Sequence, residues 1–136
     1  MDDIKPIDVA LLVLRIAVGV IMAAHGAQKV FGIWGGPGIE GFAQVMKNLN
    51  FNPPLLWAWI AGIAEFGGGI LLALGILPRL SAASIAATMF VAAVFVHGKG
   101  GLFASSGGFE YPLLILLVSL SIVIAGGGKL SLFNKL

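Results

Sequence analysis

The chain carries long apolar segments in which single ionisable residues stand alone. Between Leu55 and Leu77, Glu65 is the only side chain that ionises, and Arg15 interrupts the apolar segment Val9 to Val30 in the same way. A charge at bilayer depth is costly unless it meets an opposite charge, a hydrogen-bond partner or water. The two residues therefore predict a membrane protein with a polar centre.

The composition supports a membrane location. The 136 residues are 59% hydrophobic and 10% charged, with a mean hydropathy of +1.04, whereas a soluble domain carries about 25% charged residues. The net charge of +2 comes without a basic cluster, which argues against a nucleic-acid partner. The absence of cysteine excludes disulfides, thiolate metal sites, iron–sulfur clusters and dithiol redox chemistry.

We expect an all-α fold, an integral membrane four-helix bundle that forms a single domain over residues 1–136. No two-residue alternation appears, and a lipid environment requires backbone hydrogen bonds within each helix. Two of the four segments reach the roughly 20 residues that cross a bilayer, and two are shorter. The predicted spans are about 9–30, 55–77, 80–97 and 111–125.

A short amphipathic helix is predicted at about 39–50, between the first two spans. Its apolar residues recur at helical spacing, and polar residues lie mostly on the other side. This pattern is typical of a helix that lies on the membrane surface, and a cap over the bundle is the competing interpretation. The apolar set is Ile39, Phe42, Val45, Met46 and Leu49.

Four spans place both termini on one side of the membrane. The N-terminus lacks the positive region of a cleavable signal, so the first segment is expected to remain as a span. Lysine and arginine slightly favour the terminal side, which predicts a multi-pass protein of the cell membrane with cytoplasmic termini. The basic residues on that side are Lys5, Arg79, Lys129 and Lys135, against Lys29, Lys47 and Lys99 on the other.

Helical spacing aligns Arg15 with Gly19 and Gly26, and Glu65 with two further glycines. Small residues let helices approach closely, so Glu65 is expected to face another helix. A rise of about 1.5 Å per residue places Arg15 and Glu65 at similar depth, and we expect them to form an ion pair. A purely structural clasp that fixes the helix register is the competing interpretation.

The predicted polar pocket gathers six residues on the side away from the termini. His25, Glu65, His97 and Glu110 are the candidates for proton exchange or catalysis, because histidine titrates near neutral pH and carboxylates accept protons. Arg15 and Lys29 are the candidates for binding a ligand oxyanion. The competing interpretations are helix-end stabilisation for the histidines and Glu110, and an interfacial position for Lys29. Haem between the histidines and a histidine–carboxylate metal site are weaker alternatives, and no metal ligands are assigned.

Short motifs follow one another along almost the whole chain. They are Leu14-Arg15, His25-Gly26-Ala27-Gln28-Lys29-Val30-Phe31-Gly32, Glu65-Phe66-Gly67-Gly68, Leu74-Gly75, Pro78-Arg79, His97, Gly107-Gly108-Phe109-Glu110 and Gly126-Gly127-Gly128-Lys129-Leu130-Ser131-Leu132. This ordered set resembles the DoxX family of small membrane proteins. Phe133 departs from the pattern, because the family usually carries an aspartate after Ser-Leu, and Lys129 stands where arginine is common.

The resemblance implies four transmembrane helices and a redox setting, since the family takes its name from a subunit linked to a quinol oxidase and to thiosulfate oxidation. We therefore expect a membrane subunit that handles quinone, or a small sulfur or oxidised compound, in the polar pocket. Without a redox-active side-chain pair, electrons require a bound cofactor or a partner subunit. A scaffold for a soluble redox partner and a small-molecule carrier, active as a homo-oligomer, are the alternatives.

Overall fold

The computed structural model describes residues 3–135, and the fold is all-α, as predicted. Over those residues a single isolated bridge, between Ile76 and Phe133, is the nearest approach to a strand. The helices lie within one turn of their predicted ranges. They are α1 (Pro6–Phe31), α2 (Gly38–Asn48), α3 (Pro54–Leu74), α4 (Pro78–Val91), which continues as a π-helical turn over Ala92–Val96, and α5 (Glu110–Ala125).

Proline and glycine set the ends of the long helices. Pro6, Pro54 and Pro78 occupy the first turns of α1, α3 and α4, where a missing N–H costs nothing. Gly32 and Gly75 end α1 and α3 in the left-handed conformation, with φ of 70° and 72°. These local signals set the starts of α1, α3 and α4 and the ends of α1 and α3.

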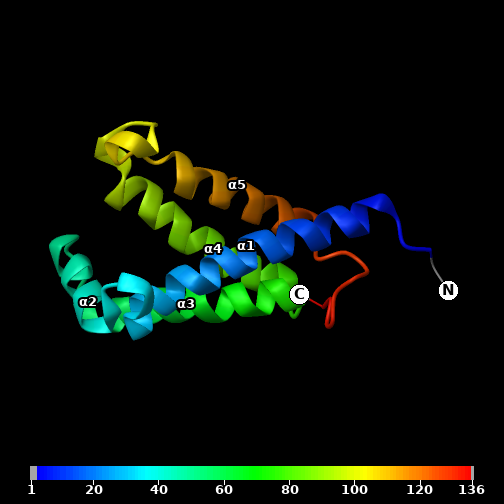
Figure 1. Ribbon diagram of the computed structural model, residues 1–136, viewed down its shortest axis with the longest axis horizontal. Helices are drawn as coiled ribbons and strands as arrows, with labels where there is room; N and C mark the ends of the chain where they lie inside the picture. Colours follow the sequence, from blue (N-terminus) through cyan, green and yellow to red (C-terminus); the bar gives the residue numbers. More distant parts are fainter. Residues whose placement is uncertain (1–2, 136) are drawn as a thin grey trace.

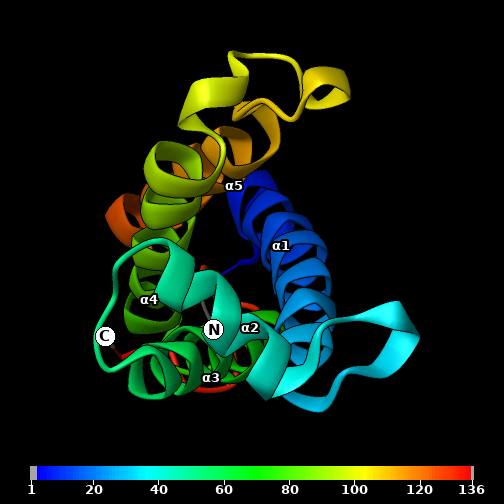
Figure 2. The same cartoon turned by 90° about the vertical axis from the view of Figure 1, so that its left-hand side faces the viewer.

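The four long helices run side by side, and both ends of the chain lie at one end of the molecule (Figure 1). α1 packs most extensively against α3, and α4 against α5 and α3. Seen end-on in Figure 2, α2 lies across the beginning of α3, at the end away from the termini. Toward that end the α4–α5 pair diverges from the α1–α3 pair (Figure 1).

Glycines bring α1 and α3 into backbone contact. A Cβ atom added to Gly19 would lie 2.5 Å from the Gly69 carbonyl oxygen, and one on Gly69 would lie 2.5 Å from the Ala23 nitrogen. One turn after Ala23 on α1, a Cβ on Gly26 would lie 2.6 Å from the Phe66 Cα. No side chain fits in this seam, so the glycines fix the register of the two helices.

The same register leaves the first two turns of α3 beyond the end of α1. Gly62 lies against Val30, near the last residue of α1, so the eight residues that precede Gly62 extend past it. This extension is covered by α2, whose Phe42 and Met46 are buried with Ala58. The amphipathic helix therefore rests its apolar face on α3.

The C-terminal segment closes the terminal end of the bundle. The Leu77 N–H donates to the Phe133 carbonyl at 2.9 Å, and the Phe133 N–H donates to the Gly75 carbonyl at 3.0 Å. The Lys129 N–H donates to Asp8 Oδ1 at 2.9 Å. The tail is thereby tied to both α1 and the α3–α4 turn.

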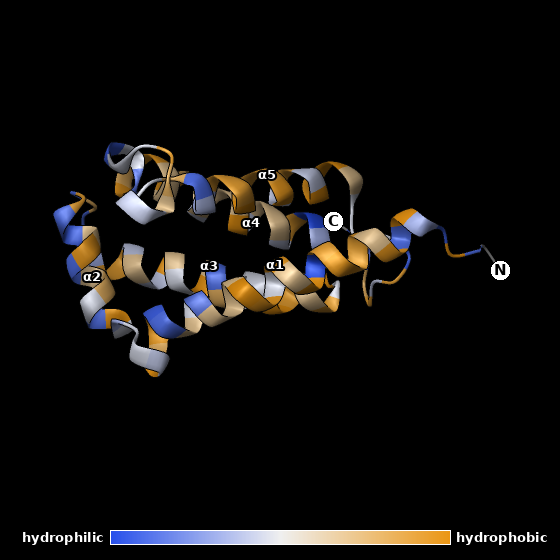
Figure 3. Cartoon of the chain, turned by 45° about the horizontal axis from the view of Figure 1, so that its top comes forward, coloured by the Kyte–Doolittle hydropathy of each residue, from blue (hydrophilic) through white to orange (hydrophobic). Residues whose placement is uncertain are grey.

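The outer surface of the helices is apolar. Val20, Ile63, Leu114 and Ile124 are more than half exposed, and Figure 3 shows hydrophobic residues along the long helices, with hydrophilic ones concentrated near the ends and on α2. α1, α3 and the 19-residue helix Pro78–Val96 are each long and apolar enough to cross a membrane. An apolar surface of this extent requires lipid contact, so the chain is a multi-pass membrane protein.

The glycine seam makes a direct prediction for two neighbouring positions. Gly69→Ala should lower the thermal stability of the detergent-solubilised protein, because its methyl group meets the α1 backbone and overpacking costs about 1–3 kcal/mol. Gly67→Ala is the matched control, since its methyl group would lie 4.0 Å from the nearest atom, Ile63 Cγ2. Equal melting temperatures for the two variants would contradict the seam.

Candidate functional site

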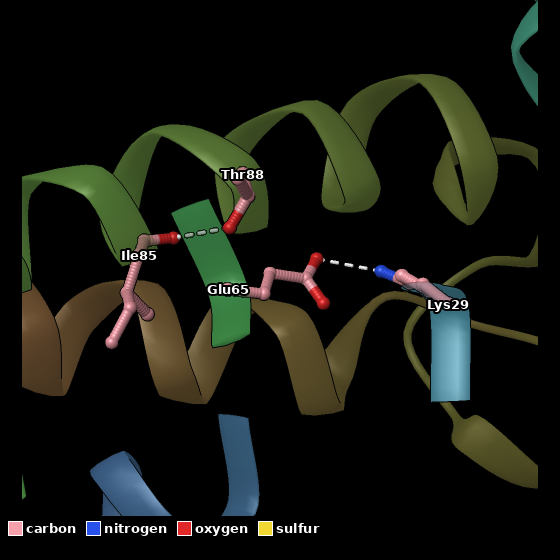
Figure 4. Close-up of polar contacts among 4 residues, drawn as sticks. All are labelled: Lys29, Glu65, Ile85 and Thr88. Atoms are coloured by element: carbon pink, nitrogen blue, oxygen red, sulfur yellow. Dashed lines mark hydrogen bonds and ion pairs between the residues drawn. The ribbon is translucent and has the colours of Figure 1, made fainter. Parts of the chain in front are cut away.

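The buried carboxylate of Glu65 is paired with Lys29. The Lys29 ammonium at the last turn of α1 lies 2.6 Å from Glu65 Oε1 in the middle of α3. Glu65 is 2% exposed, whereas the Lys29 side chain is 25% exposed. Figure 4 shows the carboxylate extended from α3 toward the ammonium group. The second oxygen, Oε2, is buried and accepts no hydrogen bond from the described residues.

The predicted ion pair between Arg15 and Glu65 is wrong. The prediction aligned the end of α1 with the beginning of α3, whereas the seam sets Val30 against Gly62. Arg15 consequently lies against Gly75, ten residues below Glu65 on α3, or about 15 Å at the helical rise per residue. Lys29, predicted to bind a ligand oxyanion with an interfacial position as the alternative, is the residue that this register brings to the carboxylate.

Arg15 instead holds the C-terminal segment. It is fully buried, and its Nη2 donates to the Leu130 carbonyl. Its Nε and Nη1 atoms have no acceptor among the described residues. Gly75 is required beside it, because a Cβ there would collide with Nη1. Arg15 is therefore part of the closed terminal end of the bundle and lies apart from the Lys29–Glu65 pair.

A cavity of about 340 Å³ lies at the Lys29–Glu65 pair, between α3 and α4 and beneath α2. Its size is within the range of about 300–1,000 Å³ that is usual for ligand pockets. Lys29 and Glu65 supply the charge, and Ser84 and Thr88 the hydroxyl groups. The remaining lining residues are apolar: Phe42, Met46, Phe51, Trp57, Ile60, Ala61, Ala64, Ala87, Val91, Ala92 and Val96.

The role of α2 in this cavity could not be predicted from the sequence. The Phe42 ring lies 4.9 Å from Lys29 Nζ, in cation–π geometry, and Met46 lines the same wall. Helical spacing indicated an apolar face on this helix, but that face fitted the membrane surface as well as a cavity roof. Phe42 and Met46 were the residues that could have indicated a cavity roof. Only the three-dimensional arrangement distinguishes this interpretation from a helix on the membrane surface.

The other candidates lie outside the cavity lining. His25 is exposed on α1, with its ring 5.7 Å from that of Tyr111 on α5. His97 Nδ1 lies 3.1 Å from the Gly107 carbonyl oxygen, and Glu110 Oε1 accepts a hydrogen bond from the Ala104 N–H at 2.8 Å. In the structure, His97 and Glu110 thus brace the loop between α4 and α5.

No three histidine, aspartate or glutamate side chains of residues 3–135 lie close enough together to hold a metal ion. Structural metal sites use three or four converging ligands.

Comparison with known proteins places the chain in a family. Residues 10–98 match the sequence profile described as DoxX. The chain belongs to the DoxX family. An uncharacterized protein of Haemophilus influenzae is 36% identical to this DoxX protein over 132 residues, which cover 92% of this chain and 89% of the relative.

Two further relatives extend the comparison. A Bacillus subtilis protein named "Putative oxidoreductase CatD" is 27% identical to this DoxX protein, over 94% of this chain and 87% of the relative. A second uncharacterized protein of Haemophilus influenzae is 30% identical, over 91% and 81% respectively. No solved structure matches the chain.

The position of Arg15 predicts a local effect on the tail. Arg15→Leu should speed cleavage after Lys129 by a lysine-specific protease about tenfold, because a hydrogen bond from a charged donor is worth about 1.5–3 kcal/mol. Lys47→Gln, which changes an exposed lysine of α2 at the other end of the molecule, is the control. Cleavage would be followed over time by mass spectrometry. Equal cleavage rates for the two variants would contradict the contact between Arg15 and the C-terminal segment.

Proposed function

We propose that this DoxX protein is the membrane subunit of a redox system and binds a quinone-type ring in the cavity at Lys29 and Glu65. The observation that carries the proposal is the Lys29–Glu65 ion pair, whose carboxylate is buried, in a cavity with otherwise mostly apolar walls. A redox-active ring compound soluble in lipid has this combination of an apolar body and polar oxygen atoms. The name of the Bacillus subtilis relative supports a redox role.

The ion pair leaves hydrogen-bonding capacity for a ligand. Lys29 has three N–H donors, of which one reaches Glu65 Oε1, and Oε2 is without a partner among the described residues. A ring carbonyl can accept from Lys29, and a ring hydroxyl can also donate to Oε2. The pair is therefore suited to hold a quinone or quinol oxygen and to receive the proton that a quinol releases.

We assign supporting positions to the remaining candidate residues. His25, His97 and Glu110 belong to the same end of the bundle as the cavity, where proton exchange with the membrane surface would take place. Arg15, at the opposite end, is left without contact to the ligand. Electrons would pass to a partner subunit that carries its own cofactor, because the chain contains no cysteine for dithiol chemistry.

The membrane arrangement follows from the same geometry. We propose that α1, α3, α4 and α5 all cross the cell membrane as a four-helix bundle, with α2 at the interface. α5 has 16 residues, so its ends would lie close to the membrane surfaces. The termini would be cytoplasmic, because Lys5, Arg79, Lys129 and Lys135 outnumber the basic residues at the other end.

The cavity favours ligand binding over a purely structural role. A scaffold would need only a dry bundle in which polar groups fix helix packing. In this chain the partly exposed Lys29 side chain and Glu65 both line a cavity, and Glu65 Oε2 has no partner among the described residues. A carrier would use the same residues and is distinguished by transport assays on proteoliposomes.

The proposal predicts saturable quenching of tryptophan fluorescence by a tail-less dimethoxymethylbenzoquinone in nanodiscs. Trp57 lines the cavity, so Trp57→Phe should remove the saturable component. Glu65→Gln and Lys29→Met should weaken binding about tenfold or more, since a hydrogen bond to a charged group is worth about 1.5–3 kcal/mol.

The controls separate site binding from partitioning into lipid. Trp59→Phe should keep the saturable component, because Trp59 does not border the cavity. Unsaturable quenching in the wild type, or full affinity in both charge variants, would refute the proposal and favour the scaffold.

A further inference from the structure

A second hollow continues the cavity along the seam between α3 and α4. It encloses about 250 Å³ and is lined on α3 by Ile63, Gly67 and Leu71, and on the α4 side by Leu80 and Ser84, among others. Ser84 also lines the cavity at the Lys29–Glu65 pair. The two hollows are thus neighbours along the seam, on either side of Ser84, whose hydroxyl lies 3.4 Å from the Ala64 carbonyl oxygen of α3 and narrows the space between them.

Two consecutive glycines shape this hollow. At Gly68, an added Cβ would lie 2.5 Å from Ser84 Oγ, so α3 and α4 approach closely and close its floor. At Gly67, an added Cβ would meet nothing nearer than Ile63 Cγ2 at 4.0 Å, so the space above Gly67 stays open. A larger residue at Gly67 would fill this space without displacing the backbone.

The hollow offers an apolar chain many contacts and a polar group almost none. Ile63 and Leu80 are each 57% exposed and form its outer walls. The two hydroxyl groups beside it already donate within α4, from Ser81 to the Pro78 carbonyl and from Ser84 to the Ser81 carbonyl. A ligand head group would gain nothing here, whereas an alkyl or prenyl chain would match the surface.

We propose that the hollow over Gly67 holds the hydrocarbon tail of the molecule whose ring is bound at Lys29 and Glu65. This inference rests on the proposed function and narrows the substrate to ring compounds with an alkyl or prenyl tail, rather than small water-soluble anions. The shared lining residue Ser84 selects this occupant, because a tail that leaves the cavity along the α3–α4 seam meets the second hollow next. The tail would then run deeper into the bilayer while the head stays beneath α2.

The expected gain in affinity is modest, because a tail that leaves lipid for the hollow gains packing but no hydrophobic transfer energy. In nanodiscs, at equal membrane concentration, the wild type should bind a decyl-tailed benzoquinone about three- to tenfold tighter than its tail-less analogue. Gly67→Leu should abolish this preference and leave the tail-less affinity unchanged. Gly67→Ala is the matched control and should retain it.

Leu71→Trp, which narrows the same hollow from its exposed side, provides a second variant if Gly67→Leu fails to assemble. Equal affinity for both compounds in the wild type, or a preference that both variants retain, would overturn the tail site. Displacement of the decyl compound by an alkane of equal length would also overturn it, since the hollow would then take any acyl chain. So would a change in oligomeric state of Gly67→Leu in native mass spectrometry, which would indicate a contact between copies.

The proposed function and the tail site fail in different ways. If the tail site is wrong, Glu65→Gln still weakens binding of the tail-less compound while Gly67→Leu has no effect on either ligand. If the proposed function is wrong, the tail-less compound shows no saturable binding that depends on Glu65. A tail preference without that dependence would overturn the inference as well, because the ring would not be held at the ion pair.

Discussion

The close approach of α1 and α3 through glycine is the constraint on which the site depends. Backbone contact at Gly19, Gly26 and Gly69 leaves the two helices no freedom to slide. In that register Lys29 lies beside Glu65, and Arg15 lies beside Gly75, ten residues further along α3. The glycines, which have no side chain, thus determine which cation lies beside the buried carboxylate.

The divergence of the α4–α5 pair from the α1–α3 pair gives the ion pair its surroundings. At the terminal end the helices stay together, and the C-terminal segment is tied across them by hydrogen bonds to Asp8 and Gly75. At the other end, α2 covers the extension of α3 and supplies Phe42 to the Lys29 ammonium. One end of the molecule is closed, and the other holds a cavity that opens among apolar helices.

The sequence predicted the all-α fold and the helix bounds well, because apolar length, prolines at helix starts and glycines at helix ends are local signals. It identified Lys29 and Glu65 as site candidates but chose the wrong partner for the carboxylate. Pairing depends on how far two antiparallel helices are offset, and periodicity along one helix contains no information about that offset. The same limit applies to Phe42. It follows Lys29 by 13 residues, but periodicity does not show how the turn after α1 brings α2 back onto the ammonium group.

The most direct test of the central claim is a double-mutant cycle on the ion pair, followed by thermal unfolding in detergent. We expect Lys29→Met and Glu65→Gln each to destabilise the protein, and the double variant to lose less than the sum of the two. The expected coupling is about 0.5–3 kcal/mol, the range for residues in direct contact. Strict additivity would show that Lys29 and Glu65 do not interact and would contradict the account.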